Sequence, residues 1–221
     1  MIFRARRYDL VVFDWDGTLF DSTALIVRSI QNSCRDVGAV VPDDRQAAYV
    51  IGLGLEDALR SAVPGLPRER YPELARRYRH HYLASQHELS LFTGALPILH
   101  ALKSRNHWLA VATGKSRRGL DDVLDTVQLK GLFDATRTAD ETASKPDPLM
   151  LNELIAEIGA DPARTLMIGD TTHDLQMADN AGTASVAVAY GAHEPRAFAD
   201  HAPLAVVHST AELHAWLDHH A

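Results

Sequence analysis

Seven polar or small residues lie where apolar runs of the sequence give way to loops, and their types suit chemistry on phosphate. They are Asp14, Asp16, Thr113, Gly114, Lys145, Asp170 and Asp174. Carboxylates that converge at one point repel one another unless a cation lies among them, and oxygen ligands select a hard metal such as Mg²⁺. A hydroxyl and an ammonium group instead suit phosphoryl oxygens. Metal and phosphate ligands together predict phosphoryl transfer.

The chain around these residues alternates between predicted strands and helices. Strands are predicted at 8–13, 108–112, 133–136, 165–168 and 184–189, and helices at 116–127, 148–158 and 175–181. Such alternation predicts an α/β fold, with a Rossmann-like parallel sheet and helices on both of its faces. Because ligands bind at the carboxyl ends of parallel strands, we expect the seven residues to meet at one edge of the sheet.

Residues 20 to 91 differ from the rest because their pattern predicts helices only. A helix is expected to begin at Ser22, with Ser22 or Asp21 placed to cap it, and apolar positions between 71 and 82 recur on one helix face. We therefore expect an all-helical cap domain at 20–91, inserted after the first strand of a core at 1–19 and 92–221. The glycines of Gly52-Leu53-Gly54 either let backbone approach a ligand or form a simple turn.

Composition and charge exclude several classes of protein. Hydrophobic residues make up 46% of the chain and charged residues 23%, which is typical of a folded protein and not of a disordered one. The net charge of -7 disfavours a general nucleic-acid-binding protein, and no apolar run resembles a membrane span or a signal peptide. The single cysteine, Cys34, fits a reducing compartment. We expect a soluble cytoplasmic protein without nucleic-acid or membrane partners; nothing in the sequence indicates an oligomeric state.

Four segments, in order along the chain, resemble the signature motifs of the haloacid dehalogenase superfamily. They are Asp14-x-Asp16-Gly17-Thr18, Thr113-Gly114, Lys145-Pro146 and Gly169-Asp170-x-x-x-Asp174. The helical insertion stands where members with a small helical cap carry theirs, so the similarity covers essentially the whole chain. Segments 13–19 and 51–54 are most similar to the phosphoglycolate-phosphatase-like branch.

The resemblance implies a catalytic or binding role for each of five residues. Asp14 would be the nucleophile that forms an aspartyl-phosphate, and Asp16 would act as general acid and then general base. Thr113 and the backbone at Gly114 would bind phosphoryl oxygens. Lys145 would help to bind the phosphate and would neutralise both the nucleophile and the developing charge.

The resemblance also implies a metal site and, with it, a reaction. Mg²⁺ would be held by Asp14, by the main-chain carbonyl of Asp16 and by Asp170, while Asp174 would orient that shell. The expected function is a Mg²⁺-dependent phosphatase that hydrolyses a small phosphomonoester, similar to phosphoglycolate, and its partner would be a small phosphorylated metabolite.

Other activities of the superfamily compete with this function. Dehalogenation needs no acid or base two residues after the nucleophile, so Asp16 favours phosphoryl chemistry. Phosphonate cleavage needs a cap lysine, and residues 19–91 contain none. A sugar phosphomutase would share every core residue and stays open, as does a non-catalytic phosphate-binding module. The arginines between 60 and 79 and the histidines, His173 excepted, are expected to be ordinary surface residues.

Overall fold

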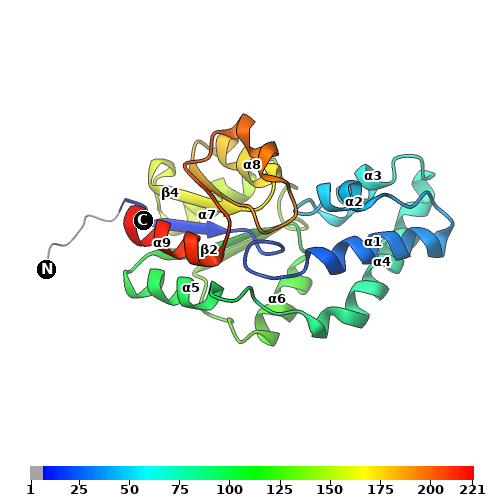
Figure 1. Ribbon diagram of the computed structural model, residues 1–221, viewed down its shortest axis with the longest axis horizontal. Helices are drawn as coiled ribbons and strands as arrows, with labels where there is room; N and C mark the ends of the chain where they lie inside the picture. The colour runs from blue at the N-terminus through cyan, green and yellow to red at the C-terminus, as the bar shows by residue number, and fades with distance from the viewer. Residues whose placement is uncertain (1–6) are drawn as a thin grey trace, which may run out of the picture.

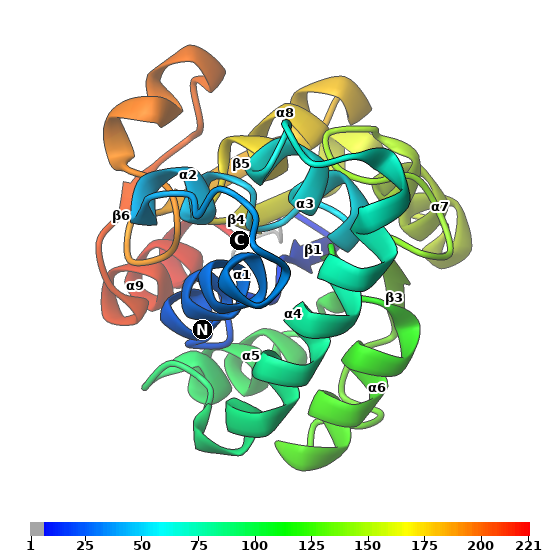
Figure 2. The same ribbon diagram turned by 90° about the vertical axis from the view of Figure 1, so that its right-hand side faces the viewer.

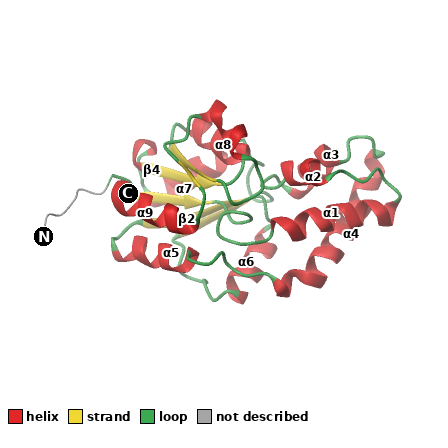
Figure 3. Ribbon diagram, in the orientation of Figure 1, coloured by secondary structure: helices red, strands yellow, loops and turns green. Residues whose placement is uncertain are grey.

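The computed structural model describes residues 7–221 and contains a six-stranded parallel sheet at its centre (Figure 1, Figure 3). The strands are β1 (Leu10–Phe13), β2 (Trp108–Thr113), β3 (Ala135–Thr138), β4 (Thr165–Gly169), β5 (Ala184–Val188) and β6 (Val206–Val207). They lie in the order β3-β2-β1-β4-β5-β6, and every neighbouring pair is parallel. All carboxyl ends therefore share one edge, and the end of β1 lies between those of β2 and β4.

Helices cover both faces of the sheet because each central strand is apolar on both sides. Val11 and Phe13 of β1 pack into one hydrophobic layer, whereas Leu10 and Val12 pack into the other. The first layer includes α5 (Ala95–Ser104), α6 (Arg117–Thr126) and α9 (Thr210–His220), and the second includes α7 (Leu149–Ile158) and α8 (Thr172–Ala181). A continuously apolar strand covered on both faces is typical of parallel sheets. The predicted α/β fold is confirmed.

The chain between β1 and β2 folds into helices with a hydrophobic cluster of their own. These helices are α1 (Thr23–Val37), α2 (Asp44–Tyr49), α3 (Leu55–Ala62) and α4 (Tyr71–Ser85), with 3-10 turns η1 (Arg68–Arg70) and η2 (Gln86–Glu88). Ile30, Leu59 and Leu74 lie at the centre of this cluster, which is distinct from the two layers on the sheet. Figures 1 and 2 show the four helices beyond the carboxyl edge of the sheet.

We propose that residues 20–91 form a cap domain on a core made of 1–19 and 92–221. The separate hydrophobic cluster of the helices supports this division. Residues 1–6 of the proposed core lie outside the described residues. Among residues 7–221, no helix combines the length and the apolar character that crossing a bilayer requires.

Several elements differ from those predicted. Strand β3 begins two residues after the predicted start at Phe133, because that ring packs edge-on against Trp15 and Asp134 accepts a hydrogen bond from Leu109 N–H. Helix α8 begins three residues before the predicted start, since Thr171 forms a capping box with the third residue of the helix. No expectation covered α5, β6, α9, η3 (Pro162–Arg164) or η4 (Pro195–His201).

Candidate active site

The carboxyl edge of the sheet brings the predicted residues together from distant parts of the chain. Asp14 follows β1, Thr113 ends β2 and Asp170 follows β4, and all three side chains are buried. Carboxylate oxygens of Asp14, Asp170 and Asp174 lie within 4.8 Å of one another. This acidic cluster stands at the edge where the sequence predicts it.

Lys145 compensates part of the charge of the acidic cluster. It lies in the loop before α7, and its Nζ donates to Asp14 Oδ1 at 2.5 Å and to Asp174 Oδ1 at 2.6 Å. Burial alone would lower the pKa of a lysine, but the two carboxylates outweigh burial and raise the pKa of Lys145 above its usual value. The side chain therefore carries a positive charge beside Asp14.

The acidic cluster sets three carboxyl groups against one lysine. Burial raises the pKa of Asp14 well above its usual range; Lys145 opposes that shift, and Asp174 and Asp170 add to it. Burial, with help from Asp174, raises the pKa of Asp170 to about 7. Asp14 Oδ2 is buried and has no hydrogen-bond partner within the described part of the chain. An oxygen-only donor set with a buried, unpaired carboxylate oxygen fits a hard divalent cation.

The first motif holds Asp170 in place. Thr18 Oγ1 donates to Asp170 Oδ1 at 2.9 Å, and the N–H of Ala192 donates to Oδ2 at 2.7 Å. A Cβ on Gly17 would lie 2.2 Å from Asp170 Oδ2, and the φ of +87 at this glycine would itself strain any other residue. The Asp-Gly-Thr sequence is therefore more than a turn, because it packs against and orients the carboxylate across the edge.

Asp174 uses both carboxylate oxygens for contacts within the protein. Oδ1 accepts from Lys145, and Oδ2 accepts from the hydroxyl of Thr171 at 2.7 Å and from its main-chain N–H at 3.1 Å. These bonds fix the start of α8 and the position of the lysine. The orienting role of Asp174 stays a prediction, because its carboxylate also lies within the cluster that could hold a metal ion.

The carboxylate of Asp16 lies outside the acidic cluster. Its Oδ1 accepts from Ser22 Oγ at 2.6 Å and lies 3.0 Å from Lys115 Nζ. If Asp16 joins the metal site, it does so through its main-chain carbonyl, which stays a prediction. Lys115 was missed by the sequence analysis, although it directly follows Thr113-Gly114 and is one of only four lysines in the chain. The scarcity of lysine and the position directly after a strand end are the signals in the sequence that point to Lys115.

The cap segment 50–54, between α2 and α3, packs against the edge that holds the candidate site. A Cβ on Gly114 would lie 2.3 Å from the carbonyl oxygen of Leu53 and 2.5 Å from that of Gly52. The N–H of Gly54 donates to Ser144 Oγ at 2.9 Å, in the loop that contains Lys145. The paired glycines thus allow a close backbone approach between cap and core.

Two histidines of the core donate hydrogen bonds to the cap at Tyr49, the residue that precedes segment 50–54. The main-chain carbonyl of Tyr49 accepts from Nε2 of His173 at 2.8 Å and of His193 at 3.0 Å. Burial lowers the pKa of both, that of His193 to about 4. The expectation of ordinary surface histidines is wrong for His193 and also for His107, which are buried. The arginines of α4, by contrast, are exposed as expected.

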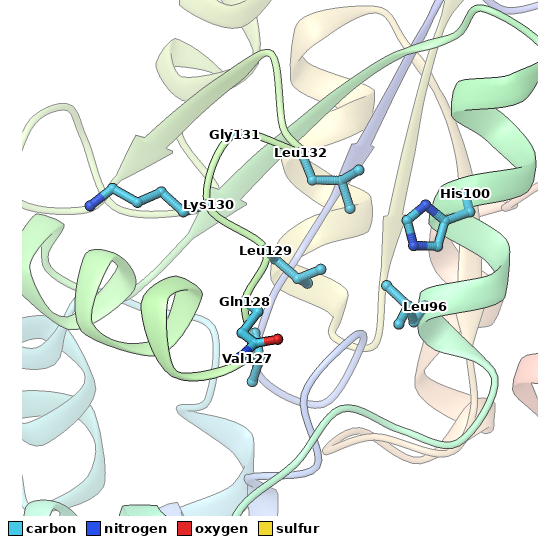
Figure 4. A pocket seen from close by; sticks show the side chains of 8 residues that line it. All are labelled: Leu96, His100, Val127, Gln128, Leu129, Lys130, Gly131 and Leu132. Atoms are coloured by element: carbon cyan, nitrogen blue, oxygen red, sulfur yellow. The ribbon is translucent and has the colours of Figure 1, made fainter.

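A separate cavity lies away from the candidate residues. It has a volume of ≈ 380 Å³ and lies between α5 and the loop that follows α6 (Figure 4). Leu96 and His100 line it from the helix, and residues 127–132 line it from the loop. Because no predicted site residue borders this cavity, it does not belong to the acidic cluster.

Known proteins resemble this chain in both sequence and architecture. Residues 11–188 match the family of haloacid dehalogenase-like hydrolases. The "Probable phosphatase IndB" of Dickeya dadantii is 37% identical over 190 residues, which cover 83% of this chain and 82% of that protein. A phosphoglycolate phosphatase of Aliivibrio fischeri is 30% identical over 203 residues, which cover 88% of this chain and 89% of that protein. The crystal structure of a predicted phosphoglycolate phosphatase from Haemophilus somnus gives a TM-score of 0.82 at 25% identity and covers 94% of this chain and 96% of that one.

The parallel sheet with helices on both faces and the similarity to these phosphatases identify a hydrolase of phosphate esters. More narrowly, the chain belongs to the haloacid dehalogenase-like hydrolases. The resemblance to the phosphoglycolate-phosphatase-like branch is confirmed by the same relatives.

Proposed function

We propose that this chain is a Mg²⁺-dependent phosphatase that hydrolyses a small phosphomonoester, similar to phosphoglycolate, through an aspartyl-phosphate on Asp14. The observation that carries the proposal is the buried contact between Asp14 and Lys145 beside Asp170. Relatives named phosphatase and phosphoglycolate phosphatase support the same reaction. Cys34, buried and unpaired, suits a reducing compartment, and we place the enzyme in the cytoplasm.

The reaction uses Asp14 and Asp16 in turn. A carboxylate oxygen of Asp14 attacks phosphorus, and the bond from phosphorus to the leaving oxygen breaks as Asp16, acting as the general acid, gives a proton to that oxygen. Asp16, now a carboxylate, removes a proton from the water that attacks the acyl phosphate, which releases inorganic phosphate and restores Asp14.

Three groups stabilise the charge that develops on the phosphoryl oxygens. Lys145, held at 2.5 Å from Asp14, offsets the negative charge of the nucleophile and of the transferring group. The Thr113 hydroxyl and the backbone at Gly114 lie at the end of β2 and bind phosphoryl oxygens. These groups are fixed before substrate arrives, so little reorganisation is required during the reaction.

The carboxylates of Asp14 and Asp170 and the main-chain carbonyl of Asp16 would hold the metal. When bound, Mg²⁺ would supply positive charge for the phosphoryl oxygens that no side chain of the cluster provides. Thr18 keeps Asp170 oriented toward this position. Asp174 positions Lys145.

A phosphate-release screen with Mg²⁺ tests the proposed function. The panel contains 2-phosphoglycolate, sugar phosphates, nucleotides and pyrophosphate. The proposal predicts release from a small phosphomonoester by the wild-type chain and none by Asp14→Asn. Poor net release together with activation by a sugar bisphosphate would instead identify a phosphomutase. No turnover of any compound, with phosphate still bound, would identify a non-catalytic binding module.

A further inference from the structure

Lys115 lies between core and cap, beside the proposed acid and base. Its Nζ is 3.0 Å from Asp16 Oδ1 in the core and donates to the hydroxyl of Tyr82 in α4, also at 3.0 Å. Its side chain is only 11% exposed. Burial alone would lower the pKa of this lysine, but Asp16 and Tyr82 outweigh burial and raise the pKa above its usual value. A charged ammonium group is therefore enclosed at the boundary of the two proposed domains.

The proposed chemistry of phosphorus does not use this ammonium group. Lys145 already pairs with Asp14 and Asp174, and the described structure gives the Lys115 ammonium two other partners, Asp16 and Tyr82. An ammonium group has three N–H donors, so one more acceptor can bind. The contact with Asp16 keeps this ammonium group beside the residue that is proposed to protonate the leaving group.

The neighbours of Lys115 determine which leaving group suits it. An acid that protonates the leaving oxygen must lie within hydrogen-bond distance of it, so the rest of the leaving group lies close to Lys115. On the cap side, the rings of Tyr78 and Tyr82 stack at a centroid distance of 6.0 Å, and the Lys115 ammonium lies 4.8 Å from the centroid of the Tyr82 ring. In the step in which Asp16 acts as the acid, its carboxyl group no longer balances the charge of Lys115, so an anionic group on the leaving group is favoured there and a neutral or positive one is disfavoured.

We propose that Lys115 is a specificity-determining residue that binds a carboxylate on the leaving group. The enzyme then prefers short phosphorylated acids to uncharged phosphomonoesters of the same size. This inference rests on the proposed function, because it takes Asp16 as the group that protonates the leaving oxygen. It assigns selectivity to a core residue that directly follows the phosphate-binding pair Thr113-Gly114, not to a cap side chain.

A matched pair of substrates tests the proposal. 2-Phosphoglycolate and ethyl phosphate differ in that a carboxylate replaces a methyl group. For the wild type, kcat/KM is expected to be about 100-fold higher with 2-phosphoglycolate. Lys115→Met should lower this value about 100-fold and the value for ethyl phosphate by less than about fivefold, so the preference disappears. Lys115→Arg should keep most of the preference for 2-phosphoglycolate, because arginine is also positively charged.

Lys130→Met serves as the matched control, because Lys130 is a surface lysine that pairs with Asp125. Lys130→Met should leave kcat/KM unchanged for both 2-phosphoglycolate and ethyl phosphate. If Lys115→Met does not fold, as judged by thermal melting, Lys115→Gln replaces it, since its amide can still donate to Asp16 or Tyr82 but carries no charge. The same loss of preference is expected.

Two results would overturn the inference alone. One is a wild-type enzyme that hydrolyses both substrates equally well; the other is an equal loss on both substrates in Lys115→Met, which would show that the lysine only positions Asp16. A wild-type chain that hydrolyses neither these esters nor p-nitrophenyl phosphate would instead overturn the proposed function.

Discussion

Replacing Gly114 with alanine is expected to separate the cap segment 50–54 from the core. A Cβ at this position would lie 2.3 Å from the carbonyl oxygen of Leu53 and 2.5 Å from that of Gly52. Because carbon–oxygen contacts in proteins are about 3.3 Å or longer, the two segments must move apart by about 1 Å. Gly114 does not have a positive φ, so alanine is not strained there and its N–H is kept.

A shift of about 1 Å in groups that close over a substrate costs about 100-fold in rate, and we expect that loss in kcat/KM for Gly114→Ala. Steady-state phosphate release measures it, and thermal melting checks that the core stays folded. Gly119→Ala is the matched control, because a Cβ there would meet only Ser116 Oγ, at 3.3 Å. Wild-type kcat/KM in Gly114→Ala would refute the reasoning, since the close contact would then be dispensable in the reactive state.

Chelation by EDTA should abolish activity and Mg²⁺ should restore it, whereas Ca²⁺, with about six to eight oxygen ligands, should inhibit by engaging both oxygens of Asp14; full activity in chelator would contradict the metal site. Burial raises the pKa of the Asp170 carboxyl group from 3.8 to about 7, so the folded chain binds a proton on this group more tightly than the unfolded chain does. Without metal, the free energy of unfolding should therefore fall as the pH rises from about 4 to about 7. The gain in Tm from Mg²⁺ should therefore be larger at about pH 8 than at about pH 5, and equal gains would count against the assignment. Gly54→Val, whose Cβ would meet Ala139 Cβ at 3.2 Å, should lower kcat/KM by about tenfold or more if the segment meets substrate; a change in Tm alone would identify a simple turn.

The sheet and its polar edge could be predicted because both depend on short-range patterns. The buried run of β1 and its neighbours alternates with helices, and that alternation dictates parallel strands whose carboxyl ends meet. Asp14, Thr113 and Asp170 each stand directly at such an end, so their meeting followed from topology. Strand β6, with two residues, has too short a pattern to detect.

The contacts between cap and core could not be predicted in the same way. They depend on how two hydrophobic clusters, each folded around its own residues, dock on one another, and no local spacing records that. The carbonyl of Tyr49 between His173 and His193 is such a contact, and so is Lys115 between Asp16 and Tyr82. Three of the contributing segments still have a signal in the sequence: the glycines of Gly52-Leu53-Gly54, His173 beside the fourth motif, and Lys115 as a rare lysine at a strand end.

Covalent phosphorylation of Asp14 is the central claim, and trapping the intermediate tests it most directly. The wild-type chain is mixed with a hydrolysed phosphomonoester and Mg²⁺, quenched in acid during turnover, digested and analysed by mass spectrometry. The peptide that contains Asp14 should gain the mass of one phosphoryl group. Asp14→Asn should show no such gain, keep its fold and lose at least about 10³-fold in kcat. A phosphoryl group on any other residue, or near wild-type turnover by Asp14→Asn, would contradict the account.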